Sequence, residues 1–276
     1  MAESPRGPQG RVGGNASPFR RSVTGRVSVV AHRGLSAEAP ENTMASFRRA
    51  AEVSCDLLEF DVHLSKDGVL VVIHDDTLER TTNGRGLVRE HTWAELSRLD
   101  AGAWFSARFA GERLPRFEEL ATWAKASGVV LSCEIKQPTP ATGLAPYGGI
   151  ERAVAEVLRA NGLERRALVH SFDHPTIQRF GALLPEVTTA VSYGGGTFVE
   201  PLVLAKAAGA SGIHPWWAWA SPDTCAAAHA AGMHVHAWGT PEPAEAQVTA
   251  TLVRAGVDSL DANDPRLLRA ILAALA

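Results

Sequence analysis

The feature that most constrains the fold is an alternation, from Arg26 to the end of the chain, of short apolar runs with longer helix-like stretches. The eight runs with strand character are 27–31, 56–62, 129–135, 166–170, 186–191, 211–214, 233–238 and 257–260. The stretches between them space their apolar residues as helices do, and several end at a glycine. This pattern predicts an α/β fold, a (β/α)8 TIM barrel. A doubly wound open sheet is the alternative, because periodicity does not prove closure, but the number and length of the strands favour the barrel.

Two segments interrupt the alternation. Residues 70–73 have the pattern of an extra strand after a turn at 66–68, and residues 75–115 then contain turn dipeptides and no long helix. We therefore expect an inserted segment of about residues 75–115 after the second strand. A loop rich in Pro and Gly at 137–149 follows the third strand. Loops after barrel strands line the face that carries active sites, so both segments are candidate lids or substrate walls.

Composition argues against several classes of protein. Residues 1–25 are rich in Gly, Pro, Ser and Arg and lack the apolar core of a secretory signal, so we expect a disordered tail before one domain at 26–276. The net charge of −3 gives no general attraction to nucleic acid. No apolar stretch approaches the ~18 residues that span a membrane, so stable membrane insertion is not expected. The three cysteines, Cys55, Cys133 and Cys225, are scattered, which favours buried thiols in a reducing, cytoplasmic location.

Polar residues gather at the ends of the first three predicted strands and after the extra strand. They are His32-Arg33, Glu59-x-Asp61, His74-Asp75 and Glu134-x-Lys136. Side chains two residues apart in a strand share a face, so both members of each spaced pair point the same way. The carboxyl ends of barrel strands meet at one rim, so we expect these groups to lie close together.

The carboxylates among these residues predict a metal site. Carboxylates on buried strands are costly unless a cation joins them. Three such ligands, Glu59, Asp61 and Glu134, with no thiolate beside them, favour one hard divalent cation, Mg²⁺ or Ca²⁺. Arg33 and Lys136 beside that cation make a site for an anion, and phosphate suits both side chains.

The histidines add acid/base chemistry. Either His32 activates the attacking oxygen and His74 protonates the leaving alcohol, or the reverse, because the sequence does not distinguish the two orders. A cation, two basic side chains and an acid/base pair together describe phosphoryl transfer. Each group alone has a structural explanation, such as a hydrogen-bonded histidine or a solvated carboxylate pair. Only their joint placement at one rim indicates catalysis.

The segments that carry these residues resemble the glycerophosphodiester phosphodiesterase family. They are AHRG at 31–34, PENT at 40–43, LEFDVHLSKDGVLVVIHDDTLERTTNGRG at 58–86 and EIK at 134–136. The resemblance is strongest in the N-terminal half, where the motifs are long. It implies a TIM barrel with an inserted segment after the second strand, and a phosphodiesterase activity.

The resemblance also implies roles for individual residues. The metal ligands would be Glu59, Asp61 and Glu134, the acid and base His32 and His74, and the phosphate-binding cations Arg33 and Lys136. Glu41 and Asn42 of the PENT segment would hold these groups in position without contacting the substrate, with capping of the following helix as the alternative.

The C-terminal half departs from the family's pattern. A Trp-Thr-Val-Asn-like run after strand seven is replaced by the residues 238–241, WGTP, and a Thr-Asp pair after strand eight is replaced by Ala262-Asn263. Pro241 cannot give the amide contacts of an Asn, so we expect weaker selectivity for glycerol. Trp238 remains a substrate-binding candidate, as an apolar wall for a small alcohol. The tryptophans that extend this wall, or that simply pack under the rim, are Trp216, Trp217 and Trp219.

We therefore expect a metal-dependent phosphodiesterase that hydrolyses glycerophosphodiesters, small-molecule substrates, to an alcohol and glycerol 3-phosphate. The alternatives are a lysophospholipase D or phospholipase C-like barrel enzyme on lipid phosphodiesters, and a catalytically inactive phosphate-binding barrel. A carbon–carbon-cleaving barrel enzyme is a further option, but it would usually need a Schiff-base lysine or a metal held by histidine. The alcohol, the choice between Mg²⁺ and Ca²⁺, and the oligomeric state stay open.

Overall fold

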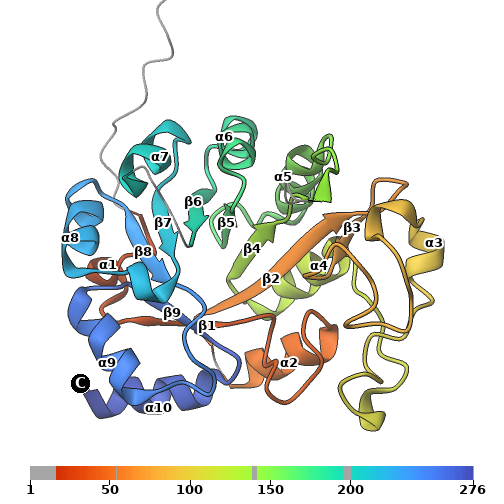
Figure 1. Ribbon diagram of the computed structural model, residues 1–276, viewed down its shortest axis with the longest axis horizontal. Helices are drawn as coiled ribbons and strands as arrows, with labels where there is room; N and C mark the ends of the chain where they lie inside the picture. The colour runs from red at the N-terminus through yellow and green to blue at the C-terminus, as the bar shows by residue number, and fades with distance from the viewer. Residues whose placement is uncertain (1–16, 54, 139–141, 195–199, 276) are drawn as a thin grey trace, which may run out of the picture.

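Eight parallel strands close into a barrel in the computed structural model, which describes residues 17–53, 55–138, 142–194 and 200–275 (Figure 1). The barrel strands are β1 (Ser28–Ala31), β2 (Leu57–Leu64), β4 (Leu131–Ile135), β5 (Ala167–Ser171), β6 (Thr188–Tyr193), β7 (Gly212–Pro215), β8 (His234–Ala237) and β9 (Ser259–Ala262). Strand β1 pairs with both β2 and β9, so the sheet has no free edge there. This pairing confirms the TIM barrel and excludes the doubly wound alternative. Each predicted run coincides with one barrel strand, with its ends shifted by at most two residues.

Helices surround the barrel on its outside (Figure 1). They are α2 (Met44–Glu52), α4 (Phe117–Ser127), α5 (Ile150–Asn161), α6 (His174–Leu183), α7 (Pro201–Ala207), α8 (Pro222–Ala230), α9 (Ala246–Ala255) and α10 (Pro265–Leu275). Helix α5 illustrates why these segments fold as they do: Ile150, Val154 and Leu158, each four residues apart, are buried. It ends at Gly162, whose φ of 66° is in the left-handed region that favours glycine.

The predicted insertion is a folded unit beside the barrel. Strand β3 (Leu70–Val72) pairs antiparallel with the end of β2, as the sequence predicted. The chain then continues through η1 (Val88–Glu90), α3 (Trp93–Leu96) and η2 (Ala107–Phe109) before it reaches α4. These short elements enclose a small core of their own, made of Val71, Ile73, Leu78, Val88, Leu96, Ala101 and Leu114. The insertion is therefore rigid enough to hold side chains against the barrel rim.

The expectation that residues 1–25 form a disordered tail is wrong for residues 17–25. Residues 1–16 lie outside the described residues, but residues 17–25 are ordered and include the short helix α1 (Arg21–Thr24). The Ser17 hydroxyl hydrogen-bonds Nδ1 of His234 (2.9 Å), and the Arg21 amide donates to Asp258 Oδ1 (2.6 Å). His234 lies in β8 and Asp258 directly before β9, both far along the chain, so the sequence of the tail alone gives no sign of these partners.

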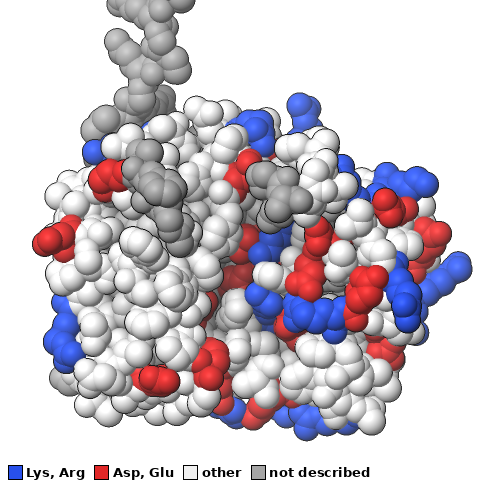
Figure 2. Space-filling view, viewed as in Figure 1, with Lys and Arg blue, Asp and Glu red and all other residues white. Residues whose placement is uncertain are grey.

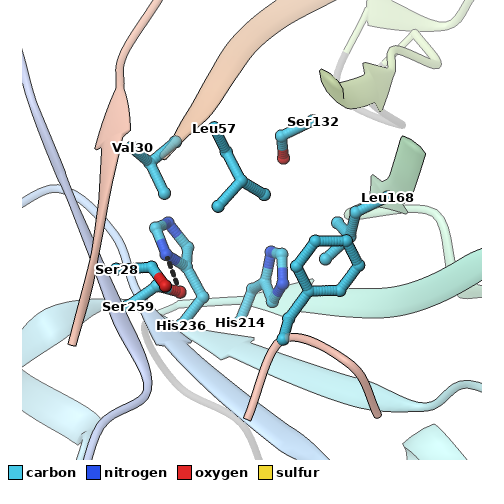
Figure 3. A pocket seen from close by; sticks show the side chains of 9 residues that line it. Ser28, Val30, Leu57, Ser132, Leu168, His214, His236 and Ser259 are labelled. Atoms are coloured by element: carbon cyan, nitrogen blue, oxygen red, sulfur yellow. Dashed lines mark hydrogen bonds between the residues drawn. The ribbon is translucent and has the colours of Figure 1, made fainter. Parts of the chain in front are cut away.

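The barrel interior is polar near the amino ends of its strands. A cavity of about 10 Å³, room for at most one water molecule, lies there beside Phe19. Figure 3 shows His214 and His236 pointing into this cavity, with His236 Nδ1 and Ser259 Oγ 2.9 Å apart. Nε2 of His214 lies 3.0 Å from Nε2 of His234. Only one proton fits between these two nitrogens, so the accepting ring must be neutral, and burial lowers the pKa of both rings, which favours their neutral forms.

Two smaller expectations concern the cysteines and membrane segments. Cys55, Cys133 and Cys225 are free thiols, of which Cys133 and Cys225 are buried and Cys55 is half-buried. Within the described ranges, no helix is both long and apolar enough to cross a membrane.

The neutral histidines of the interior predict a pH-dependent stability. Burial lowers the pKa of His234 to about 4, and burial together with His236 brings the pKa of His214 well below its usual value. An imidazole in the unfolded chain titrates near 6.5. The stability that these neutral rings contribute is therefore present above about pH 6.5 and is lost as the pH falls toward about 4.

We expect the free energy of unfolding, measured in urea, to fall between about pH 7 and about pH 4.5. The variant His214→Gln keeps a donor for His234 and should reduce the slope by up to about 1.4 kcal/mol per pH unit, the value for one proton. The matched control is His91→Gln, at a partly exposed histidine of the insertion, which should leave the slope unchanged. An unaltered slope in His214→Gln would contradict a neutral pair.

Candidate active site

Three carboxylates meet at the carboxyl ends of β2 and β4. Glu59 and Asp61 project from β2 and Glu134 from β4, where Asp61 and Glu134 are direct partners in the strand pairing. Each offers an oxygen that lies within 4.8 Å of the others. All three side chains are buried, with exposed fractions of 6%, 1% and 8%. The structure thus brings together the three residues that the sequence singled out as metal ligands.

Two basic side chains compensate most of this negative charge. Lys136 Nζ lies 2.6 Å from Glu134 Oε1 and 3.0 Å from Asp61 Oδ1, and Arg33 Nε lies 3.5 Å from Asp61 Oδ2. Burial alone would raise the pKa of Asp61, but Lys136 and Arg33 bring it far below its usual range. Burial would lower the pKa of Lys136, but Asp61 and Glu134 raise it above its usual value. Both groups are therefore charged at neutral pH.

Glu59 is the carboxylate with the least compensation. It accepts the Arg33 backbone N–H at Oε2 (2.9 Å), but no lysine, arginine or histidine of the described residues lies within ion-pair distance of it. Burial and the neighbouring Asp61 raise its pKa well above the usual value. A hard divalent cation among the three oxygens would remove this imbalance, so the donor set fits Mg²⁺ or Ca²⁺.

The turn after β1 places Arg33 at the cost of backbone strain. Arg33 has a φ of 56°, in the left-handed region that costs a residue with a long side chain about 1–3 kcal/mol. The next residue, Gly34, has a φ of 88°, and a Cβ there would collide with Ser46 of α2. This conformation aims the Arg33 backbone N–H at Glu59 while its guanidinium reaches Glu41 (2.7 Å). The strain indicates a position fixed for function.

Glu41 and Asn42 of the PENT segment contact the groups of the site, and the last residue of the segment, Thr43, caps the helix. Asn42 Nδ2 donates to Asp61 Oδ2 (2.8 Å), and the Asp61 backbone N–H donates to Asn42 Oδ1 (3.3 Å). Glu41 holds Arg33 and also Arg80 from the insertion (2.8 Å). The cap of α2 is Thr43, which accepts from the Ser46 amide. Neither Glu41 nor Asn42 therefore caps the helix, which was the alternative role for these two residues.

The second histidine is oriented by the insertion. His74 Nδ1 lies 2.6 Å from Asp75 Oδ1, and Arg80 Nε lies 2.6 Å from the other oxygen of Asp75. Burial would raise the pKa of Asp75, but Arg80 and His74 lower it to about 2. Burial lowers the pKa of His74, against the opposing effect of Asp61. Behind it, the buried His63 donates from Nε2 to the carbonyl of His74 (3.0 Å).

The first histidine is oriented by a different kind of group. His32 Nδ1 lies 3.0 Å from the side-chain oxygen assigned to Asn263, which follows β9, and the hydroxyl of Ser36 lies 3.0 Å from the same atom. Asp261, two residues earlier on the inward face of β9, is also buried. Burial raises the pKa of Asp261 against the opposing effect of His32. An amide therefore faces His32 where a carboxylate faces His74.

Charged and aromatic side chains occupy different sides of the barrel mouth. Figure 2 shows lysine, arginine and acidic side chains gathered on the side of β2 and β3, around a central hollow, and few of them over β7 and α8. On the less charged side lie Phe172, Trp216 and Trp219, which are 46%, 37% and 46% exposed. Trp238 is half-buried and contacts Phe172 edge-to-face, with 5.1 Å between ring centroids. Trp217 instead packs against the core.

This arrangement agrees with comparisons to known proteins. A family model described as the glycerophosphoryl diester phosphodiesterase family matches residues 32–267, which include every group described at the rim. The chain belongs to this family. The identification made from the N-terminal motifs is thereby confirmed, and with it the assignment to the phosphoric diester hydrolases.

Relatives and solved structures of the family cover nearly the whole chain. A glycerophosphodiester phosphodiesterase of Caldanaerobacter subterraneus subsp. tengcongensis is 35% identical over 240 residues, 87% of this chain and 95% of the relative. The structure of a glycerophosphodiester phosphodiesterase from Agrobacterium tumefaciens matches with a TM-score of 0.73 and 30% identity, over 88% of this chain and 99% of that one. A phosphodiesterase of Oleispira antarctica in complex with the product sn-glycerol-3-phosphate matches with a TM-score of 0.78 and 27% identity, over 91% and 98%.

Several residues of the site were missed by sequence reasoning. His63 lies two residues beyond Asp61 on the same strand face, so the alternation that linked Glu59 to Asp61 also pointed to it. Arg80 and Phe172 gave no local signal, because an arginine in a loop and an aromatic after a strand are common in any barrel. Asp261 lies in the last strand as Glu59 and Asp61 lie in the second, and the same search for carboxylates in strands would have found it.

Because the negative charge of Glu59 is poorly compensated, we expect Glu59 to destabilise the metal-free protein and to be needed for cation binding. In the presence of a chelator, Glu59→Gln should raise the melting temperature, because it removes a buried charge and keeps the oxygen that accepts from Arg33. The expected rise is a few degrees, on the scale of about 2–4 °C per kcal/mol for chains of 150–250 residues. Adding Mg²⁺ or Ca²⁺ should stabilise the unaltered protein but not this variant. The control is Glu52→Gln on the exposed face of α2, and a Glu59→Gln protein that still gained stability from the cation would contradict the assignment.

Proposed function

We propose that the protein is a metal-dependent phosphodiesterase that hydrolyses glycerophosphodiesters to an alcohol and glycerol 3-phosphate. The observation that carries the proposal is the cluster of Glu59, Asp61 and Glu134 with Lys136 and Arg33 at one rim of the barrel. The family and the product complex of the Oleispira antarctica phosphodiesterase support the choice of substrate. Three buried carboxylates support one Mg²⁺ or Ca²⁺ ion, which when bound would supply a Lewis acid for the phosphate oxygens.

The side chains of this chain divide the remaining work. Arg33 and Lys136 neutralise the charge that develops on the phosphate oxygens, and the fork of Arg33 suits two of those oxygens at once. His32 and His74 each use Nδ1 for a partner of their own, and their Nε2 atoms have no hydrogen-bond partner among the described residues. They handle the protons of the attacking oxygen and of the leaving alcohol. Trp238, with its indole N–H bonded to the carbonyl of His214, forms a fixed apolar wall.

The direct test is a coupled assay for release of glycerol 3-phosphate from glycerophosphocholine and related diesters. We expect turnover in the presence of Mg²⁺ or Ca²⁺ and none in excess chelator. Adding back the two ions separately identifies the cation that supports turnover. Full activity in chelator would remove the metal from the proposal, and no release from any glycerophosphodiester would overturn the activity itself.

Proton transfer is tested by varying the leaving group. Replacing a general acid or base by alanine should cost about 10²–10⁴ in rate on a glycerophosphodiester with an alkyl alcohol. A p-nitrophenyl diester needs no proton on its leaving oxygen, so the histidine that supplies this proton should lose much less on that substrate. The measurement is kcat for His32→Ala and His74→Ala on both substrates. Equal losses for both variants on both substrates would argue against an acid among them.

A lipid phosphodiester is the second candidate substrate, and the exposed aromatic side chains favour it. Phe172, Trp216 and Trp219 beside the mouth offer an apolar surface for an acyl chain. If lysophosphatidylcholine is a substrate, Phe172→Ala and Trp216→Ala should lower its kcat/KM and leave that of glycerophosphocholine unchanged. Trp104→Ala, at an exposed tryptophan of the insertion, is the control. Equal effects on both substrates would rule out an acyl-binding role.

The remaining expectations stay predictions. Weaker selectivity for glycerol, expected from Pro241 and Asn263, is measured by comparing glycerophosphocholine with a diester that lacks the glycerol hydroxyls. A preference of about 10⁴ or more for the former, as in sites that read a hydroxyl, would contradict it. The absence of nucleic-acid binding, a cytoplasmic location and the oligomeric state need separate measurement.

A further inference from the structure

The backbone carbonyl of His74 lies where the chain leaves the sheet. The antiparallel pairing of β2 and β3 ends just before it, with the Ile73 amide donating to the carbonyl of Asp61 (3.1 Å). No backbone amide of the described residues donates to the carbonyl of His74. An unpaired carbonyl beside a buried strand costs free energy, so a side chain is needed in place of the missing backbone partner.

The side chain that takes this place is His63. Its Nε2 lies 3.0 Å from the carbonyl oxygen of His74, and His63 is 2% exposed. A carbonyl oxygen only accepts, so Nε2 of His63 carries a proton and donates it. His63 follows Asp61 by two residues on β2, and both side chains project from the same face of the strand. The strand that carries two of the three clustered carboxylates therefore also holds the backbone of His74.

The other nitrogen of His63 is held by Tyr147 from the loop after β4. The hydroxyl of Tyr147 lies 3.0 Å from Nδ1 of His63, and the two rings meet edge to face with 5.7 Å between their centroids. Tyr147 is buried and belongs to the main hydrophobic core. With the proton of His63 on Nε2, the Tyr147 hydroxyl can donate to Nδ1, so every group from Tyr147 through His63 to His74 has a partner.

Tyr147 is fixed in turn by two segments beside the barrel mouth. Its backbone amide donates to Oε1 of Gln137, near the start of the loop after β4 (2.7 Å). The Arg89 guanidinium of the insertion lies over its ring, 4.9 Å from the centroid, and donates to the carbonyl of Ala145 (2.6 Å). The insertion and the loop after β4 are therefore joined at this tyrosine.

The contacts of the neighbouring residues do not hold the His74 peptide itself. The hydrogen bond of the Ile73 amide fixes the residue before it. The carboxylate of Asp75 contacts Nδ1 of the His74 ring and so sets the rotation of the ring, but Asp75 belongs to the same segment and moves with it. The position of His74 relative to the carboxylates of β2 therefore depends on a contact from β2, which His63 provides.

We infer that His63 and Tyr147 are positioning residues, which hold His74 in place beside the three carboxylates and so support its proton transfer. The inference rests on the proposed function for the role of His74. Both residues act through the His74 backbone. A displacement of about 1 Å far from the reacting atoms can cost about 10²-fold in rate. Loss of this support should therefore lower kcat, whereas KM, which reflects the phosphate-binding groups, should change little.

The kinetic test compares variants of the full-length protein on glycerophosphocholine. His63→Leu removes both contacts and should lower kcat by about 10- to 10²-fold. His63→Gln keeps a side-chain N–H for the carbonyl and should recover most of this loss. Tyr147→Phe removes only the hydroxyl and should lower kcat by about two- to tenfold, the range expected for one neutral hydrogen bond. The matched control is Tyr193→Phe, because the buried Tyr193 hydroxyl has no partner among the described residues.

Three kinetic outcomes would contradict the inference. They are equal losses in His63→Leu and His63→Gln, a rise in KM with kcat unchanged, and a loss in Tyr193→Phe as large as that in Tyr147→Phe. If the two residues act as one chain, adding Tyr147→Phe to His63→Leu should lower kcat no further. Losses that multiply in the double variant would show that Tyr147 does not act through His63.

A nitrogen NMR measurement tests the inference without turnover. The protein is labelled with ¹⁵N-histidine, and the His74 signals are assigned by their loss in His74→Gln. We expect these signals to shift or broaden in His63→Leu, to return in His63→Gln and to stay unchanged in Tyr193→Phe. Tyr147→Phe, which keeps the packed ring, gives the same test if His63→Leu does not fold. Unchanged His74 signals would overturn the inference, whereas the expected shifts in a protein that hydrolyses no glycerophosphodiester would contradict the proposed function alone.

Discussion

Burial of three carboxylates at the ends of β2 and β4 is the constraint on which the rest of the site depends. Uncompensated charges at such a position would cost several kcal/mol each. Asp61 is fully surrounded, by Lys136, Arg33 and Asn42. Glu59 is not, and a divalent cation among the three carboxylates would remove this residual imbalance. Under the proposed function, a less stable metal-free state would be the cost of a preformed cation site.

The inserted segment matters because it completes the charge network from the outside. Arg80 joins Asp75, which orients His74, to Glu41, which orients Arg33. Three parts of the chain, namely the turn after β1, the start of α2 and the insertion, are thereby held in one relative position. The small apolar core of the insertion makes this possible, since a mobile loop would not fix an arginine between two carboxylates. The same network of ion pairs holds Arg33 in its strained φ.

The interior and the mouth of the barrel show two further compromises. Near the amino ends of the strands, His214 and His234 form a polar contact, and burial lowers the pKa of both rings and so favours their neutral forms. At the mouth, a charged side faces an aromatic side formed by Phe172, Trp216 and Trp238. The contact between His214 and His234 makes the stability of the protein depend on pH. Under the proposed function, the two sides of the mouth would give a phosphodiester one surface for its phosphate and another for its apolar part.

The sequence by itself determined the barrel, its insertion, the carboxylates with their basic partners, and both histidines, because strand alternation and chain order place strand-end residues at one rim. Tertiary structure alone decided which partners meet across long separations. His32 faces Asn263 and His74 faces Asp75, yet in the sequence both are histidines that follow strands. Residues 17–25, expected to be disordered, are held by His234 and Asp258. Local patterns report faces and periods, whereas hydrogen-bond partners depend on how the closed barrel brings distant loops together.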